Sequence, residues 1–326
     1  MANETFKTMI GGQALIEGIM MRGPEKDAIV IRGQDGLQIE TKDRKKRSPK
    51  SPLSWPFIRG PVAFFDSQVV GTKAIMTSAD LSPDGEVEEP SKFDRWLEKK
   101  LGSKRFQSFL VGSAVFLGIL MSVALFFLLP GIISSFLIDV IPNLIVLNLV
   151  EGLIRITLFV LYIMLMTRLK EMRRVFSYHG AEHKTIRCYE AGLPLTVENV
   201  RKQTRLHPRC GTSFLLIVMI ISILIFSVAS TVILRFFPGM EAYFGTVLYR
   251  IIMLAIKLLM LPLVVSVSYE INRFVGRHDN WFTRILTAPG MWFQKFTTNE
   301  PDDSMIEVGI AALEAVLPEQ EGADQW

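Results

Sequence analysis

The stretch FLLIVMIISILIFSVASTVILRFF, residues 214–237, decides the class of fold. It is apolar apart from a few hydroxyl side chains and Arg235 near its end, and a helix of this length can cross the roughly 30 Å hydrocarbon core of a bilayer. Three other stretches have the same character: residues 109–129, 147–169 and 246–268. The sequence therefore predicts an α-helical integral membrane protein with four transmembrane helices.

Composition supports this class. Apolar residues make up 49% of the 326-residue chain, and the mean hydropathy is positive, which is unusual for a soluble domain. The net charge of +4 does not indicate a nucleic-acid partner, because the basic residues cluster beside the apolar stretches. Pro130-Gly131 follows the first stretch, so we expect residues 132–140 to turn back along the outer surface.

The positive charges predict the orientation. Lys and Arg residues precede the first span and are frequent between spans two and three, at residues 168–209. In contrast, the loop 138–150 contains no Lys or Arg, and the loop between spans three and four contains only Arg235 and Arg250. By the positive-inside rule, both termini and the segment 168–209 face the cytosol. We expect a protein of the bacterial cytoplasmic membrane, whose partner is the lipid bilayer; association with another membrane protein or a second copy stays open.

Three regions follow from this reading. Residues 1–105 form a small cytosolic α+β portion, in which Gln34-Asp35-Gly36 joins two β-rich runs as a hairpin. Residues 106–268 form the membrane domain, with a cytosolic loop at 170–212. Residues 269–326 hold an interfacial segment and an acidic tail, in which apolar residues at helical spacing predict a docked helix: Ile306, Ile310, Leu313 and Leu317.

The candidate functional residues lie in the cytosolic loop. His179-Gly180-Ala181-Glu182-His183 places two imidazoles four residues apart on one helix face, where both can bind one metal ion. His-x-x-Glu-His is also the inverted zincin spacing, in which the Glu acts on water at the metal. After a turn, His207-Pro208-Arg209-Cys210 brings the chain back to this face before span three. We therefore expect His179, His183 and His207 to be metal ligands, Cys210 to be a further ligand and Glu182 to be the general base.

Neighbouring residues have supporting roles in this prediction. Glu190 lies two turns beyond His183, too far to share its ion. Glu190, together with His278 and Asp279 after span four, is expected to orient ligands rather than to bind the metal. Cys188 points to the opposite side of the helix and is expected to be a packed thiol. Gly180 costs a helix about 1 kcal/mol, which suggests that another part of the chain approaches its backbone.

Two further features leave alternatives open. Gly11-Gly12 and Arg22-Gly23-Pro24 bracket a run that could be a strand or a short helix, with Glu17 and Arg22 as an ion pair or as site residues. Charges inside the spans are costly and face a bundle interior or a cavity. We expect Glu151 and Arg155 to pair near the interface, and Lys257 to face a polar cavity or a packing partner.

Three motifs, at residues 11–24, 179–185 and 207–214, resemble those of the YqhQ-like bacterial membrane proteins. That family is a domain of unknown function labelled a predicted metal-dependent enzyme. The resemblance implies a metal at His179, His183 and His207 with Glu182 beside it, and it implies no substrate.

We expect a metal-dependent hydrolase with a zinc-type site at the cytosolic membrane surface. The alternative is a scaffold or partner-binding protein whose cytosolic loop is clamped by a structural metal. A transporter, resting on Lys257, is the weaker alternative, because the spans are few and no inverted halves are visible.

Overall fold

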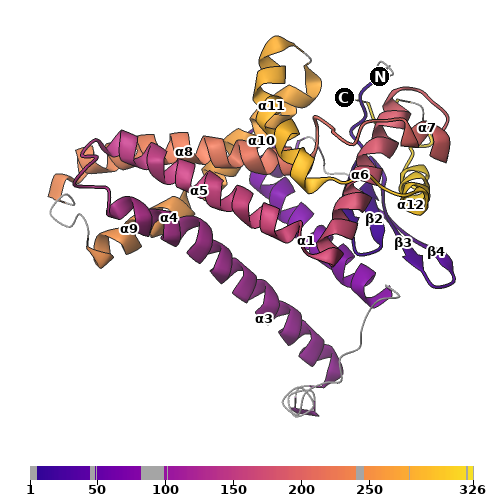
Figure 1. The fold of residues 1–326 in the computed structure, drawn as a ribbon, viewed down its shortest axis with the longest axis horizontal. Coiled ribbons are helices and arrows are strands. Elements are labelled where there is room, and N and C mark those ends of the chain that lie inside the picture. The colour runs from indigo at the N-terminus through magenta and orange to yellow at the C-terminus, as the bar shows by residue number, and fades with distance from the viewer. Residues whose placement is uncertain are drawn as a thin grey trace. The chain divides into compact units, whose positions relative to one another are not determined.

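The computed structural model describes residues 6–44, 48, 50–81, 99–100, 102–239, 246–278, 280–320 and 322–325 (Figure 1). The chain divides into two compact units. The first comprises Met1–Gly85, Tyr162–Ser222 and Met260–Trp326, and the second Glu86–Leu161 and Ile223–Leu259. The sequence also predicts an acidic loop at 81–90 and a short amphipathic helix around 93–101, and both lie almost entirely outside the described residues.

The first unit contains a four-stranded antiparallel meander of β1 (Gly11–Leu15), β2 (Gly18–Arg22), β3 (Lys26–Gly33) and β4 (Gly36–Asp43). Gly33 pairs with Gly36 across the two-residue loop Gln34-Asp35, and Gly36 has a φ of 121°, open to glycine alone. The predicted hairpin is therefore confirmed. The bracketed run 13–21 is also a hairpin, because Gly11 pairs with Arg22 and Leu15 with Gly18.

The turn between β1 and β2 docks the sheet on helix α6 (Lys170–Glu190). Glu17 holds a positive φ of 51° there, and its carboxylate pairs with Arg174 and accepts a 3.1 Å hydrogen bond from the Tyr178 hydroxyl. Arg22, in contrast, pairs with Asp27 and Asp66. Glu17 thus fixes the hairpin to the helix that carries the histidine pair.

Helix α12 (Asp303–Glu314) completes this core, as the acidic tail predicted. It packs on α6, β2 and β3 (Figure 1). The shared cluster includes fully buried apolar side chains from all three parts of the chain: Ile19, Val30, Tyr178, Ile186 and Leu313. Burying a side chain of this size contributes about 1.5–3 kcal/mol, so the sheet and both helices stabilise one another.

The sequence predicts that span two continues as helix over residues 168–191 with Gly192 as the stop, and that Thr196 caps a second short helix ended by Pro208. Helix α6 begins later than this prediction. Span helix α5 (Leu144–Met166) ends in a turn, and Leu169 is extended before α6 begins, although no Pro or Gly marks the break. At its other end, Gly192 has a φ of 65° and closes the helix as predicted. The short helix α7 (Val197–Arg201) is capped by the Thr196 hydroxyl, as expected, and it ends seven residues before Pro208.

Four helices are long and apolar enough to cross a membrane within the described part of the chain: Phe109–Ser135, Leu144–Met166, Gly211–Phe236 and Val247–Arg277. This confirms the prediction of four apolar helices. The first comprises α3 (Ser103–Val123), the π-helix Ala124–Leu128 and α4 (Leu129–Ser135), the third is α8 (Gly211–Phe236), and the fourth joins α9 (Val247–Leu259) to α10 (Leu261–Arg277).

The expectation that Pro130 ends the first helix was wrong. Pro130 has no N–H for the carbonyl of Phe126, four residues earlier. The π-helical turn absorbs this defect, because the Leu129 N–H reaches back five residues to the Ala124 carbonyl. The Arg155 Nε then donates to the Phe126 carbonyl at 2.7 Å, so the chain continues as helix to Ser135.

Arg155 belongs to a buried charged cluster in the second unit. Its guanidinium donates to Glu151 at 2.8 Å, and Lys257 contacts the same Glu151 oxygen. The pair of Glu151 and Arg155 is therefore present, and Lys257 has a carboxylate partner. Such partners are what makes an ionised side chain tolerable in an apolar environment.

The first unit also contains a 3₁₀ turn (Pro52–Ser54), α1 (Arg59–Leu81) and α11 (Trp281–Thr297). Helix α1 packs on α10, where Arg59 pairs with Glu270. Helix α11 exposes Trp281 and Trp292 and buries Phe293, which is the amphipathic character expected of an interfacial segment.

Candidate metal centre

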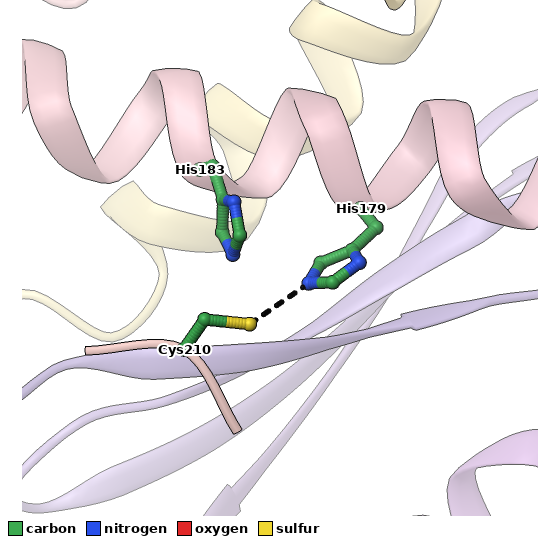
Figure 2. Close-up of side chains that lie close together, drawn as sticks. All are labelled: His179, His183 and Cys210. Atoms are coloured by element: carbon green, nitrogen blue, oxygen red, sulfur yellow. Dashed lines mark hydrogen bonds between the residues drawn. The ribbon is translucent and has the colours of Figure 1, made fainter. Parts of the chain in front are cut away.

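Three buried side chains of the first unit lie close enough to hold a metal ion (Figure 2). His179 and His183 project from one face of α6, and Cys210 lies opposite them, immediately before α8. One ligand atom from each lies within 4.8 Å of the others. The His179 Nε2 is 3.2 Å from the Cys210 Sγ. Zinc–ligand bonds of 2.0–2.3 Å in a tetrahedral site imply ligand separations of about 3.3–3.6 Å, so this pair is close to the spacing that one zinc ion needs.

Backbone carbonyls set the tautomers of both histidines. The Nδ1 of His179 lies 2.7 Å from the Thr297 carbonyl oxygen, and the Nδ1 of His183 lies 2.6 Å from that of Arg205. A carbonyl only accepts, so each Nδ1 carries the hydrogen and each Nε2 is left for the cluster. The His183 Nε2 is buried without a hydrogen-bond partner. An orphaned ring nitrogen beside a thiol fits a metal ligand, and carbonyl-bound Nδ1 groups are typical of such ligands.

Glu182 lies between the two histidines in sequence and shares their environment. One carboxylate oxygen accepts a 3.0 Å hydrogen bond from the Gly12 N–H of β1. The other is buried without a hydrogen-bond partner. Burial raises the pKa of this carboxyl, although the nearby histidines act to lower it. Glu182 is therefore fixed by one oxygen and available through the other.

The charges of His179 and Cys210 are coupled. Burial acts to lower the pKa of His179, but the charge and the hydrogen bond of Cys210 raise it to about 9. Burial acts to raise the pKa of Cys210, but His183 and His179 hold it well below its ordinary value. Without a metal, the two form a thiolate–imidazolium pair. The second histidine, whose Nε2 has no hydrogen-bond partner, adds a third potential ligand and makes the set a candidate metal site rather than a thiol–histidine pair alone.

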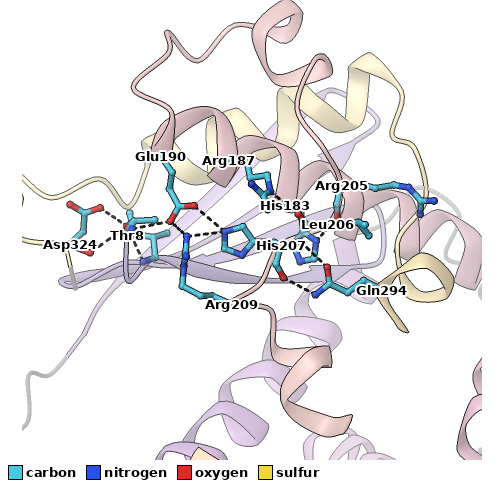
Figure 3. A network of polar contacts seen from close by, with 11 residues as sticks. Thr8, His183, Arg187, Glu190, Arg205, Leu206, His207, Arg209, Gln294 and Asp324 are labelled. Carbon is cyan, nitrogen blue, oxygen red and sulfur yellow. Dashed lines mark hydrogen bonds and ion pairs between the residues drawn. The ribbon is translucent and has the colours of Figure 1, made fainter. Parts of the chain in front are cut away.

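His207 lies beside the cluster rather than within it, and Figure 3 shows it in a polar network with Glu190 and Gln294. Its ring centroid is 5.6 Å from that of His183, and its Nε2 contacts the Glu190 carboxylate at 3.1 Å. Gln294 fixes the backbone of His207 by accepting from its N–H at 2.8 Å and donating to its carbonyl at 2.7 Å. Burial lowers the pKa of His207 to about 4 despite the Glu190 contact, so the ring is neutral at pH 7.

Glu190 is the centre of this second network. It is fully buried, pairs with Arg209 and accepts a 3.0 Å hydrogen bond from the Thr8 N–H. Burial acts to raise its pKa, but the hydrogen bond from His207 and the charge of Arg209 lower it overall. Glu190 thus connects the N-terminal segment to the loop that carries His207, and it is not itself a member of the cluster.

His278 and Cys188 lie apart from the cluster. His278 is exposed, stacks on Phe274 with ring centroids 4.3 Å apart, and donates from Nδ1 to the Phe274 carbonyl at 2.9 Å. Asp279 lies outside the described residues. Cys188 is a packed thiol beside Val200 and Ile306, and burial raises its pKa.

The sequence did not identify the groups that hold the ligands in place. The Thr297 and Arg205 groups are backbone carbonyls, which carry no signature in the side-chain sequence. Gly12 carries a weak signal in the sequence, because two adjacent glycines permit the close approach of another group to the backbone. A Cβ on Gly12 would meet the Met20 carbonyl at 2.7 Å and the Glu182 carboxyl carbon at 3.0 Å.

A pocket of about 260 Å³ opens onto the site. Glu182, His183 and Cys210 line one part of it. Three arginines line other parts: Arg22, Arg44 and Arg209. Three protein ligands and an adjoining pocket leave room for water or a substrate atom as a fourth ligand, which distinguishes catalytic from closed structural zinc sites.

Known proteins provide a family and no activity. The family described as "Protein of unknown function (DUF1385)" matches residues 55–319. The "Uncharacterized protein YqhQ" of Bacillus subtilis (strain 168) is 32% identical over 319 residues, which cover 94% of this chain and 92% of that protein. No solved structure matches the chain. The family match includes the whole ligand cluster.

Proposed function

The chain belongs to the DUF1385 family of proteins of unknown function, and we propose that it is a membrane protein that hydrolyses its substrate with a divalent metal ion. One observation carries the proposal. Three buried ligand atoms converge at a pocket, next to a Glu182 oxygen that has no hydrogen-bond partner. Two imidazole nitrogens and a thiolate favour zinc over magnesium or calcium.

Each residue of the site has a separate role in the proposed hydrolysis. A bound zinc ion would polarise the scissile group and lower the pKa of a water molecule. Glu182 accepts the proton of the attacking water through its free oxygen, while the Gly12 N–H holds the other oxygen still. His207, held by Glu190, lies beside the His183 ring and acts as a positioning residue rather than as the metal ligand expected from the sequence.

The distribution of positive charge supports the placement of this site. We propose that the protein resides in the bacterial cytoplasmic membrane with both termini in the cytosol. Cys210 directly precedes α8, the helix of the third candidate span, so the ligand is adjacent in sequence to a membrane-crossing segment. A site at this position would act on a substrate that lies in or at the inner leaflet.

A structural role for the metal is the second candidate. The ligands join α6 to the segment before α8, and Glu182 joins α6 to β1, so an ion there would also clamp this unit. A scaffold or partner-binding protein would need no more than this. The transporter hypothesis loses its main support, because Lys257 has Glu151 as its partner.

The substitution Glu182→Gln separates hydrolysis from clamping. It preserves size and the Gly12 hydrogen bond but removes the base. We expect the purified variant to retain its metal, as measured by elemental mass spectrometry. We also expect its gene to fail to complement a bacterial strain that depends on the wild-type gene. Glu198→Gln, at an exposed carboxylate paired with Lys202, is the matched control and should complement. Full complementation by Glu182→Gln would leave the clamp as the function.

A further inference from the structure

The pocket over the ligand cluster has a strongly cationic lining. Arg22 at the end of β2, Arg44 just after β4 and Arg209 just before α8 all line it, and Glu182 is the carboxylate that lines it with them. These arginines come from three separate parts of the chain, so their convergence is a tertiary feature. None of them is one of the three candidate metal ligands.

Each of these arginines also pairs with a carboxylate outside the lining, Arg209 with Glu190 and the other two as follows. Arg22 and Arg44 share one oxygen of Asp27, at 3.3 and 3.4 Å, and Arg22 also reaches Asp66 at 3.1 Å. Burial, followed by the charge of Arg22, lowers the pKa of Arg44. A guanidinium has five N–H donors, so Arg22 and Arg44 can keep these carboxylates and still donate to an anion in the pocket. Asp27 and Asp66 are not among the residues that line the pocket, so that anion would come from its open side.

A helix end contributes to the same lining. Gly211, the first residue of the 26-residue helix α8, lines the pocket next to Cys210. The N-terminus of a long helix carries a partial positive charge and favours anions. Gly11 and Gly12 line it as well, where the lack of side chains leaves the backbone exposed to a ligand.

From this lining we infer that the pocket binds a phosphate group of the substrate, held by Arg22, Arg44 and Arg209 beside the ligand cluster. The inference rests on the proposed function, since it places that phosphate next to the reacting bond. Guanidinium forks match phosphate oxygens in a bidentate manner. A phosphate offers three oxygens and almost two charges at neutral pH, which suits three arginines better than a single carboxylate does.

The shared chemistry has two sources. Gly211 begins a candidate membrane span, so a phospholipid headgroup can supply the phosphate, and a water-soluble phosphate compound can supply it equally. Both would present the same oxygens to the same arginines.

Calorimetric titration of the full-length protein with inorganic phosphate tests the inference. The protein is first stripped of metal with a chelator, so that arginines rather than an ion are measured. We expect binding to wild type and a loss of about 10- to 100-fold in Arg44→Gln, because a charge-assisted hydrogen bond is removed. Arg44→Lys, which keeps the charge without the fork, should lie between the two. Arg201→Gln, at an exposed arginine paired with Asp303, should bind phosphate like wild type.

The outcomes separate this inference from the metal proposal. Phosphate binding without any metal affinity would uphold the pocket and refute the metal site. Metal binding without phosphate binding, or equal phosphate affinity in Arg44→Gln and wild type at unchanged melting temperature, would overturn the phosphate site. Titration in phosphatidylcholine nanodiscs with and without phosphatidic acid identifies the source: competition by phosphatidic acid indicates a lipid headgroup, and unchanged affinity indicates a soluble phosphate compound.

Discussion

Replacing Gly180 by alanine tests how α6 and the Thr297–Asn299 segment hold the metal site together. On an isolated helix this substitution stabilises by about 1 kcal/mol, because glycine is the poorer helix former. In the structure, a Cβ on Gly180 would clash with the Asn299 carbonyl oxygen and would also meet the Pro301 Cδ at 3.5 Å. The obstacle is backbone, which moves less easily than a side chain.

The magnitude follows from what holds that backbone in place. The Asn299 N–H donates to the Phe176 carbonyl at 2.8 Å, and the Thr297 carbonyl accepts from His179 at 2.7 Å. Overpacking of a tight contact costs about 1–3 kcal/mol, and the tethered carbonyl favours the upper end. After the gain of about 1 kcal/mol in helix propensity, we expect Gly180→Ala to lose about 2 kcal/mol of stability.

The same displacement should weaken the metal site. The Thr297 carbonyl that fixes the His179 tautomer lies two residues from the clash, and losing such an orienting partner typically costs about 10- to 100-fold in metal affinity. Thermal unfolding of detergent-purified protein, followed by tryptophan fluorescence, measures the stability, and chelator competition measures the affinity.

Gly112→Ala is the control for this prediction. Within the described part of the chain, nothing lies within 4 Å of a Cβ at this helical glycine, so alanine should not destabilise there. A melting temperature of Gly180→Ala at or above that of wild type would refute the packing of Asn299 against α6.

Two further predictions concern charge. Zinc binding at pH 7–8 should release about one proton. Despite burial, Cys210 raises the pKa of His179 to about 9, so the metal displaces the His179 proton, whereas Cys210 is already a thiolate. Zinc affinity should therefore rise about tenfold per pH unit towards pH 9 and then level off. Calorimetry in buffers of different ionisation enthalpy that detects no proton release would exclude the pair as ligands. Glu151→Gln should destabilise the protein by about 3–5 kcal/mol, because Arg155 and Lys257 lose their shared carboxylate. The exposed Glu198→Gln should leave the melting temperature unchanged. Equal melting temperatures of the two variants would show that the charged cluster does not stabilise the fold.

Patterns that depend on neighbouring residues predicted much of this molecule. The apolar stretches are helices, Gln34-Asp35-Gly36 turns a hairpin, and the spacing of His179 and His183 puts both rings on one face. Cys210 was expected beside them because the chain must return to the same face before span three. Gly180 indicated a close backbone contact because its helix-propensity cost had no local reason.

Features that depend on distant partners were not predictable. Pro130 is a normal stop signal, and the helix continues only because a π-helical turn and Arg155 accommodate the Phe126 carbonyl. His207 has the same chemistry as the other two histidines, but Glu190 and Gln294 hold it in a separate network. The carbonyl that sets the His183 tautomer is 22 positions away in the sequence, and the carbonyl that sets the His179 tautomer is 118 positions away. No pattern of side chains predicts either contact.

The metal content of four purified proteins tests the central claim most directly. Wild type, His183→Ala, Cys210→Ala and Cys188→Ala are compared after identical purification, with elemental mass spectrometry to count ions per chain. Cys188 is the matched control, since it is an equally buried thiol outside the cluster. We predict about one divalent ion in wild type and Cys188→Ala, and almost none in the other two; equal content in all four folded proteins would contradict the metal centre.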